Sequence, residues 1–302
     1  MSINGIIAEI KSIMYQAEED LEITAAKQYH EGIVVTKLLY NSESWTNLTK
    51  ANVEELEKIQ NNSLKRLLRI PYSTPSLGLL YELQIPTIAT TIERRKLMYY
   101  HRISNQKETL AKQILMQQRS LHSNHFLKEI KSLLEQYQLQ KYDENITKIS
   151  KFQWKKLISQ ATHEKDLETT KIWCKNSSKC KNLITKERKT DYLHTLPSRA
   201  AKVLMMEKLN MTNVKMNYKG NYKNHNCSIC SNEEETTIHL LKYHQSGEPS
   251  NEILEILEKF KSNTDLPALE LKLLAKNISS SLEERDKLLS DEASTTSIDA
   301  DN

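Results

Sequence analysis

Hydrophobic residues recur at helical spacing through almost the whole chain, and this pattern limits the fold more than any other feature. In the segment 51–70, apolar side chains return every three or four residues opposite a charged face. Asn52 and Glu55, three residues apart, predict a capping box at the start of this helix, and Thr49 is the alternative first residue. Pro71 ends it, because a proline disfavours helix in the residue before it. The shared stripe consists of Val53, Leu56, Ile59, Leu64, Leu67 and Ile70.

The rest of the chain contains few of the residues and patterns that other fold classes require. Only five Gly and six Pro occur in 302 residues, so tight hairpins and Gly-rich phosphate loops are scarce, and neither a P-loop nor a G-x-G-x-x-G turn is present. No long apolar/polar alternation competes with the helical pattern. The sequence therefore predicts a mainly α fold. Further helices are expected at 88–103, 107–120, 124–139, 145–160, 181–194, 197–210 and 266–284.

Charge is unevenly distributed along the chain. The net charge is only +4, but 148–223 holds about 18 Lys/Arg against about 6 Asp/Glu. This excess predicts either a solvated helical face or a basic surface for nucleic acid. After Leu289 the sequence is acidic and rich in Ser and Thr, with too few apolar residues to fold, so we expect a disordered tail.

The pattern Cys227-x2-Cys230 followed by His239 and His244 predicts a metal site. Thiolates and imidazoles are the ligands that tetrahedral Zn²⁺ prefers, and four of them fill its shell, which indicates a structural rather than a catalytic ion. His225 is the alternative fourth ligand. No apolar run is long enough for a membrane span, and the first 20 residues do not look like a secretory signal. We therefore expect a reducing compartment, the nucleus or the cytoplasm, where a close cysteine pair binds metal rather than forming a disulfide.

Two segments of the sequence resemble the region downstream of the polymerase core in LINE-type (non-LTR) retrotransposon reverse transcriptases. The first segment, 37–103, matches a Leu-Tyr-Gly-x-Glu-x-Trp element, a Leu-x-x-Glu-Leu-Gly-x-x-Pro phrase and a basic helix. The second, 191–244, resembles the helix and zinc segment at the end of these proteins. Asn41 and Gln84 stand where the family often has Gly, and Pro86 falls one residue early. The matched residues are Leu39, Tyr40, Glu43, Trp45, Leu79, Glu82, Leu83, Arg94, Arg95 and Arg102.

The resemblance implies a division of the chain into four parts. We expect a helical thumb-like region over 1–105, a basic helical connector over 106–195, a helix with a zinc knuckle over 196–262, and a short helix with the disordered tail over 263–302. The family usually has Cys as the fourth ligand, so His244 departs from its pattern.

The resemblance also implies a nucleic-acid-binding part of such a protein without polymerase activity. The family carries its catalytic carboxylates in a Phe/Tyr-Ala-Asp-Asp motif, and no Asp-Asp pair occurs in this sequence. The expected partner is RNA or DNA, held mostly through phosphates, with a polymerase or another protein as a further partner and with no small-molecule substrate or membrane. The candidate phosphate contacts are Lys65, Arg66, Arg69, Arg94, Arg95 and Arg102.

Two alternatives stay open on the sequence alone. The chain is also compatible with a helical protein-interaction scaffold that a zinc knuckle staples, in which exposed aromatics such as Tyr99, Tyr100 and Trp154 contact protein. A decayed copy without function is the other. No G-x-S-x-G or H-E-x-x-H motif points to another enzyme, and the spacing of Cys174 and Cys180 fits no redox motif.

Overall fold

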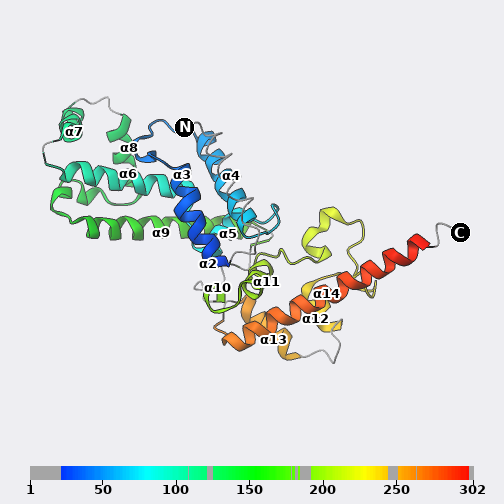
Figure 1. The fold of residues 1–302 in the computed structure, drawn as a ribbon. Helices are drawn as coiled ribbons and strands as arrows, with labels where there is room; N and C mark the ends of the chain where they lie inside the picture. Colours follow the sequence, from blue (N-terminus) through cyan, green and yellow to red (C-terminus); the bar gives the residue numbers. More distant parts are fainter. Residues whose placement is uncertain are drawn as a thin grey trace. The chain divides into compact units, whose positions relative to one another are not determined.

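The described part of the chain is almost entirely helical, as the sequence predicted, in the computed structural model (Figure 1). It contains no β-strand, only one isolated antiparallel bridge between Asn226 and Glu234. The structure describes residues 22–107, 109–120, 125–177, 179–180, 183, 192–243, 251–262 and 264–298. Within these ranges no helix has the length and apolar character that crossing a membrane requires.

The chain forms two compact units that are not continuous in sequence. Unit 1 comprises Lys27–Tyr72 and Gln84–Ile172. Unit 2 comprises residues 22–26, Ser73–Leu83 and the described residues from Trp173 onwards. The predicted bounds at 105, 195 and 262 differ from this division, and the four-part organisation stays a prediction.

Unit 1 is a set of helices around two hydrophobic clusters. One cluster lies between α6 (Ile88–Asn105), α8 (His125–Gln136) and α9 (Lys151–Asn176) and includes Leu97, Ile130 and the fully buried Trp154. The other includes Leu39 and Leu56. The elements are η1 (His30–Val35), α3 (Thr36–Leu38), η2 (Ser42–Ser44), α4 (Lys50–Leu67), α6 (Ile88–Asn105), α7 (Leu110–Ser120), α8 (His125–Gln136), η3 (Gln140–Tyr142) and η4 (Ile146–Lys148), with α2 (Ile23–Tyr29) and α9 (Lys151–Asn176) crossing the boundary with unit 2.

Helix α4 begins at the alternative start of the two that the sequence offered. Thr49 is its N-cap: the Thr49 Oγ1 accepts from the Asn52 backbone N–H at 3.2 Å, and the Asn52 Oδ1 accepts from the Thr49 N–H at 3.1 Å. The expected box from Asn52 to Glu55 is therefore wrong, because Asn52 is already the third residue of the helix. The helix ends just before Arg69, whose φ of 51° breaks the helical backbone.

Helices α6 and α9 run side by side in unit 1 (Figure 1). The Trp154 Nε1 donates to the Leu97 carbonyl at 3.0 Å, and the Thr90 hydroxyl donates to the Asp166 carboxylate. Trp154 and Tyr100 are both buried, so the expectation that they are exposed was wrong. Helix α9 starts later than the predicted 145–160, because Ser150 caps it: its Oγ accepts from the Gln153 N–H at 3.2 Å. The helix also runs further than predicted, to Asn176.

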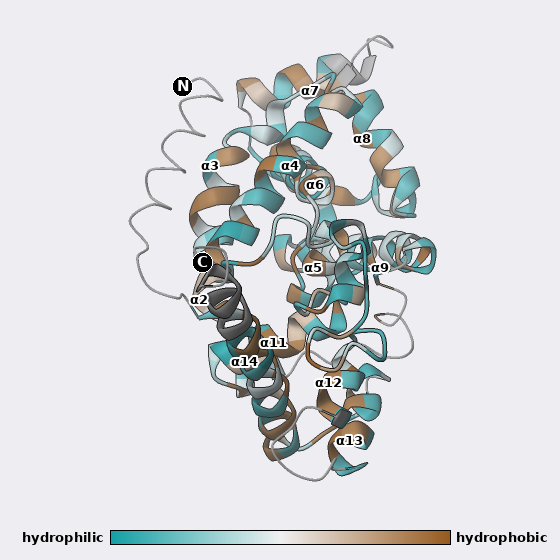
Figure 2. Cartoon of the chain, turned by 90° about the vertical axis from the view of Figure 1, so that its right-hand side faces the viewer, coloured by the Kyte–Doolittle hydropathy of each residue, from teal (hydrophilic) through white to brown (hydrophobic). Residues whose placement is uncertain are grey.

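The helices of unit 2 are connected by a buried set of polar side chains centred on Glu82. The Glu82 carboxylate accepts from the Tyr192 hydroxyl at 2.6 Å and from the Lys208 ammonium at 3.2 Å. Hydrophobic and hydrophilic bands alternate along α13 and α14 (Figure 2), as expected of helices that cover a core on one side. The elements are α5 (Ser76–Leu83), α10 (Tyr192–Thr195), α11 (Ser198–Lys208), η6 (Lys215–Asn221), α12 (Thr237–Tyr243), α13 (Asn251–Lys261) and α14 (Ala268–Ile298).

The last helix is longer than the sequence suggested. We expected a helix over 266–284 and then a disordered tail, but α14 continues to Ile298. Two causes favour the extension: Arg285 is held by a buried ion pair with Glu235, and the following residues include good helix formers such as Lys, Leu, Glu and Ala. Residues 299–302, and most of the helix expected at 181–194, lie outside the described residues.

Candidate metal centre and basic groove

The structure brings together three of the four predicted metal ligands. The ligand atoms of Cys227, Cys230 and His239 all lie within 4.8 Å of one another. The two cysteines are on one tight turn, in which the Ser231 N–H donates to the Cys227 carbonyl at 2.9 Å. His239 is in the first turn of α12, where its N–H donates to the Thr236 Oγ1 at 3.0 Å. Two thiols and one imidazole at these positions can hold a metal ion.

The His239 ring is oriented by a carboxylate on its far side. Its Nδ1 lies 3.2 Å from the Glu233 Oε2, and its Nε2 lies 3.3 Å from the Cys230 sulfur. A carboxylate accepts a hydrogen bond from Nδ1–H, and this tautomer leaves the Nε2 lone pair directed at the thiols. His239 is therefore set to bind a metal through Nε2. Nothing in the residue pattern distinguishes Glu233 from its acidic neighbours.

The two thiols have different acidities. Burial raises the pKa of Cys227. By contrast, the backbone N–H groups of Asn232 and Glu233 donate toward the Cys230 sulfur and lower its pKa. Thiolate is the form that binds metal, so Cys230 is the more readily ionised ligand.

The predicted fourth ligand, His244, lies outside the described residues. His225, the alternative, has its Nε2 at 3.0 Å from the Lys219 carbonyl and is not part of the three-residue cluster.

A buried carboxylate ties the cysteine turn to the rest of unit 2. Glu235 is 1% exposed, and its Oε2 accepts from the Ser228 N–H at 3.0 Å and from the Ser228 hydroxyl at 2.9 Å. Its Oε1 accepts from the Arg285 guanidinium at 2.9 Å and from the Lys215 N–H at 3.2 Å. Burial works against the charge, but the hydrogen bonds from Ser228 and the charge of Arg285 hold the Glu235 pKa below its usual value. The turn is thus part of a helical unit rather than an independent finger.

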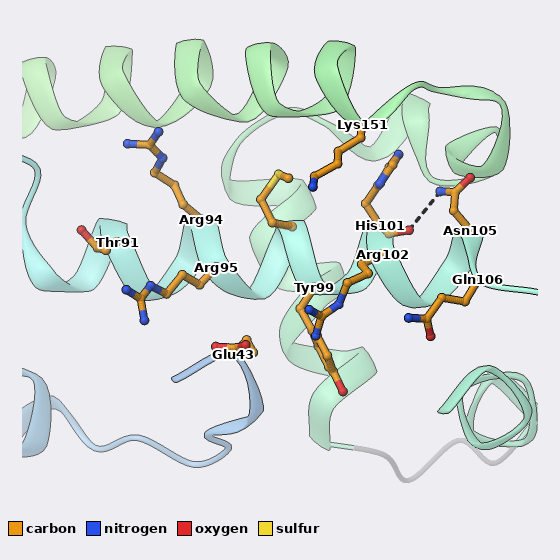
Figure 3. Close-up of a pocket in the computed structure, with 11 residues that line it drawn as sticks. Glu43, Thr91, Arg94, Arg95, Tyr99, His101, Arg102, Asn105, Gln106 and Lys151 are labelled. Carbon is orange, nitrogen blue, oxygen red and sulfur yellow. Dashed lines mark hydrogen bonds between the residues drawn. The ribbon is translucent and has the colours of Figure 1, made fainter. Parts of the chain in front are cut away.

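A basic groove of about 640 Å³ follows one face of α6 in unit 1 (Figure 3). Three of the predicted phosphate contacts line it, all from α6: the neighbours Arg94 and Arg95 and, about two turns further on, Arg102. Lys151, at the start of α9, adds a fourth cation, and Glu43 is the acidic residue in the lining. The residues that matter below are Glu43, Arg94, Arg95, Tyr99, Arg102 and Lys151. We refer to this feature as the α6 groove.

Two of the arginines in the α6 groove are anchored to the protein. The Arg95 guanidinium donates to the Leu39 carbonyl and, at 3.5 Å, to the Ser42 hydroxyl. Burial lowers the Arg95 pKa, although the charge of Glu43 opposes this effect. The Arg94 guanidinium donates to the Ser159 hydroxyl at 3.4 Å and extends toward α9 (Figure 3). Part of their donor capacity is therefore used within unit 1.

The other two cations, Arg102 and Lys151, are exposed. The Arg102 guanidinium lies over the Tyr99 ring, 4.9 Å from its centroid. The Phe126 ring supports Tyr99 edge-on, with centroids 6.0 Å apart. Arg102 and Lys151 present their charges to solvent, where an anion can reach them. Sequence reasoning missed Lys151 because it lies far from Arg102 along the chain.

The remaining predicted contacts, at the end of α4, do not line the α6 groove. Lys65 is only 4% exposed, and its ammonium donates to the Tyr72 carbonyl at 2.9 Å. Burial also lowers the Lys65 pKa. Lys65 is therefore better explained as a structural residue than as a phosphate contact. Arg66 is half-buried and Arg69 is exposed, and their role in binding stays a prediction.

No protein family, curated protein or solved structure matches the chain.

Proposed function

We propose that this chain binds RNA or DNA through its phosphates, as the C-terminal part of a LINE-type reverse transcriptase. The observation that carries the proposal is the α6 groove, where four cations and one carboxylate line a concave surface. Cations that meet phosphates release condensed counterions, which favours binding at low salt. Arg94, Arg95 and Arg102 are also the basic residues of the phrase that resembles this family.

Polymerisation is not part of the proposal. The sequence lacks the Asp-Asp pair that the family uses to hold its two metal ions. In this proposal the chain holds nucleic acid, and nucleotide addition belongs to a polymerase elsewhere.

We also propose that Cys227, Cys230 and His239 hold Zn²⁺, with His244 or His225 as the fourth ligand. The donor set fits: two thiols and one imidazole within 4.8 Å are soft and borderline ligands of the kind that zinc prefers. A bound zinc would cross-link the cysteine turn to α12. Chemistry at the metal is not proposed, because a filled four-ligand shell has no place for a substrate.

A matched pair of variants tests the nucleic-acid proposal. Arg102→Gln/Lys151→Gln removes two cations from the α6 groove, and Lys128→Gln/Lys131→Gln removes two exposed cations from α8, outside it. We expect the groove variant to bind a fluorescent oligonucleotide about tenfold more weakly than wild type in an anisotropy titration, and the control to lose much less. Equal losses would show that only net charge matters and would refute a groove site.

One observation favours the alternative of a protein-interaction scaffold. Helix α7 exposes three large apolar side chains, Leu110, Ile114 and Met116. If wild type does not bind oligonucleotides even at low salt, the face of α7 that carries Leu110 and Ile114, one turn apart, becomes the better lead. Analytical ultracentrifugation of Ile114→Ser against wild type would then show whether this face joins two copies of the chain.

A further inference from the structure

The α6 groove also holds an aromatic platform that phosphate binding does not need. Tyr99 lies between Arg95 and Arg102 on one face of α6, and all three side chains extend to the same side of the helix (Figure 3). The Arg102 guanidinium is stacked on the Tyr99 ring, 4.9 Å from its centroid, and Phe126 supports the ring edge-on. Bases stack on aromatic rings and on guanidinium planes when they are not stacked within a duplex.

We propose that the α6 groove binds a single strand of nucleic acid and stacks one of its bases against the Tyr99–Arg102 pair. This inference rests on the proposed function and adds the form of the ligand to it. Exposed Lys151 and the outer donors of Arg94 then contact the neighbouring phosphates. The base offers a flat surface that stacks on the Tyr99–Arg102 pair, and the cations of the α6 groove bind the phosphates.

The dimensions of the groove fit a short stretch of one strand. Its volume of about 640 Å³ is that of a pocket that encloses a small ligand. Residues 94 and 102 are about 12 Å apart along the helix axis at 1.5 Å per residue. A groove of this length holds a few nucleotides of a single strand. The bases of a duplex are stacked on one another, so a duplex offers the platform nothing to bind.

Glu43 makes one end of the α6 groove less favourable for phosphate binding. Its carboxylate is in the lining of the groove, near Arg95, and repels phosphates that approach that end. The strand is therefore expected to bind toward Arg102 and Lys151. Replacing Glu43 with Gln removes the repulsion and should tighten binding a few-fold.

The experiment compares one labelled oligonucleotide as a single strand and as a duplex with its complement, in RNA and DNA forms, by anisotropy at fixed salt. We expect wild type to bind the single strand at least about fivefold more tightly than the duplex. Tyr99→Ala should weaken single-strand binding about tenfold with little effect on the duplex. Tyr99→Phe keeps the ring and should retain binding, and Tyr72→Ala changes an exposed tyrosine outside the groove as a control.

The outcomes separate the two proposals. Equal affinity for single strand and duplex, or unchanged binding by Tyr99→Ala, overturns the stacking site and leaves phosphate binding intact. No binding of either form at low salt overturns both. If circular dichroism shows that Tyr99→Ala is unfolded, Arg102→Gln removes the other half of the platform from an exposed position and must then lower the preference for the single strand.

Discussion

The α6 groove and the cysteine turn both contain several polar side chains, but the charged groups are exposed in the groove and buried and paired at the turn. In the groove, Arg102 and Lys151 are exposed, so their charges are available to a ligand. At the turn, His239 and Glu235 are buried and each has partners within unit 2. Buried charges are costly unless they are paired, and exposed charges contribute little to stability. The paired, buried charges of the turn favour a structural role, whereas the exposed charges of the α6 groove are available to the ligand that we propose.

The largest effect is expected at the cysteine turn. Cys227→Ser/Cys230→Ser should abolish zinc binding and destabilise unit 2, because a structural metal contributes its binding free energy to folding. Zinc per chain, measured by mass spectrometry, should fall from one equivalent to none. Cys174→Ser/Cys180→Ser, which leaves the turn intact, should keep the metal. A wild-type protein that binds no zinc would contradict the metal proposal.

Breaking the Arg285–Glu235 ion pair should lower the free energy of unfolding by about 3–5 kcal/mol, because Arg285→Ala leaves the Glu235 carboxylate buried without the guanidinium. Urea unfolding measures this loss, and Lys287→Ala, at an exposed position of α14, is the control. Since the folded-state pKa of Glu235 lies below 4.5, its contribution is present above that pH and is lost as the pH falls further. An Arg285→Ala protein as stable as the control would show that the pair is not structural.

The buried His30 in unit 1 should make the stability of this unit depend on pH. Burial lowers the pKa of His30 to about 4, from 6.5. The unfolded chain therefore takes up the proton first, and stability that is present above pH 6.5 is lost as the pH falls toward 4, by about 3 kcal/mol in all. His30→Gln should flatten this dependence in urea titrations, and His163→Gln, at an exposed position, should not. Equal pH dependence in wild type and His30→Gln would contradict the assignment.

A smaller effect is expected from the carboxylate that orients His239. Glu233→Ala should weaken zinc affinity about 10–100-fold, because the ring loses the partner of its Nδ1–H. Competition with a chromophoric chelator measures the affinity, and Glu234→Ala, the exposed neighbour, is the matched control. If both variants bind zinc equally well, Glu233 does not orient the ring.

The sequence predicted the local features of this protein and missed those that depend on contacts between distant segments. Helix α6 follows from its periodicity, and the grouping of Cys227, Cys230 and His239 follows from ligands that are close in sequence. Lys151 and Arg285 gave no such signal, because Lys151 lines the groove with residues that are distant in sequence and Arg285 pairs with Glu235, which is 50 residues away. The burial of Trp154 was missed for the same reason, because it packs in a cluster with Leu97 and Ile130 from other helices. The burial of Lys65 was missed because its ammonium binds a backbone carbonyl, that of Tyr72, which residue type does not reveal.

Phosphate binding in the α6 groove is tested most directly by the salt dependence of oligonucleotide binding to wild type and to Arg102→Gln/Lys151→Gln. Each phosphate contact adds about 0.7 to the slope of log affinity against log salt for a single strand. We expect a steep wild-type slope that falls by about 1.4 in the variant, with Lys128→Gln/Lys131→Gln close to wild type. A slope that is the same in wild type and the groove variant would contradict recognition through the α6 groove.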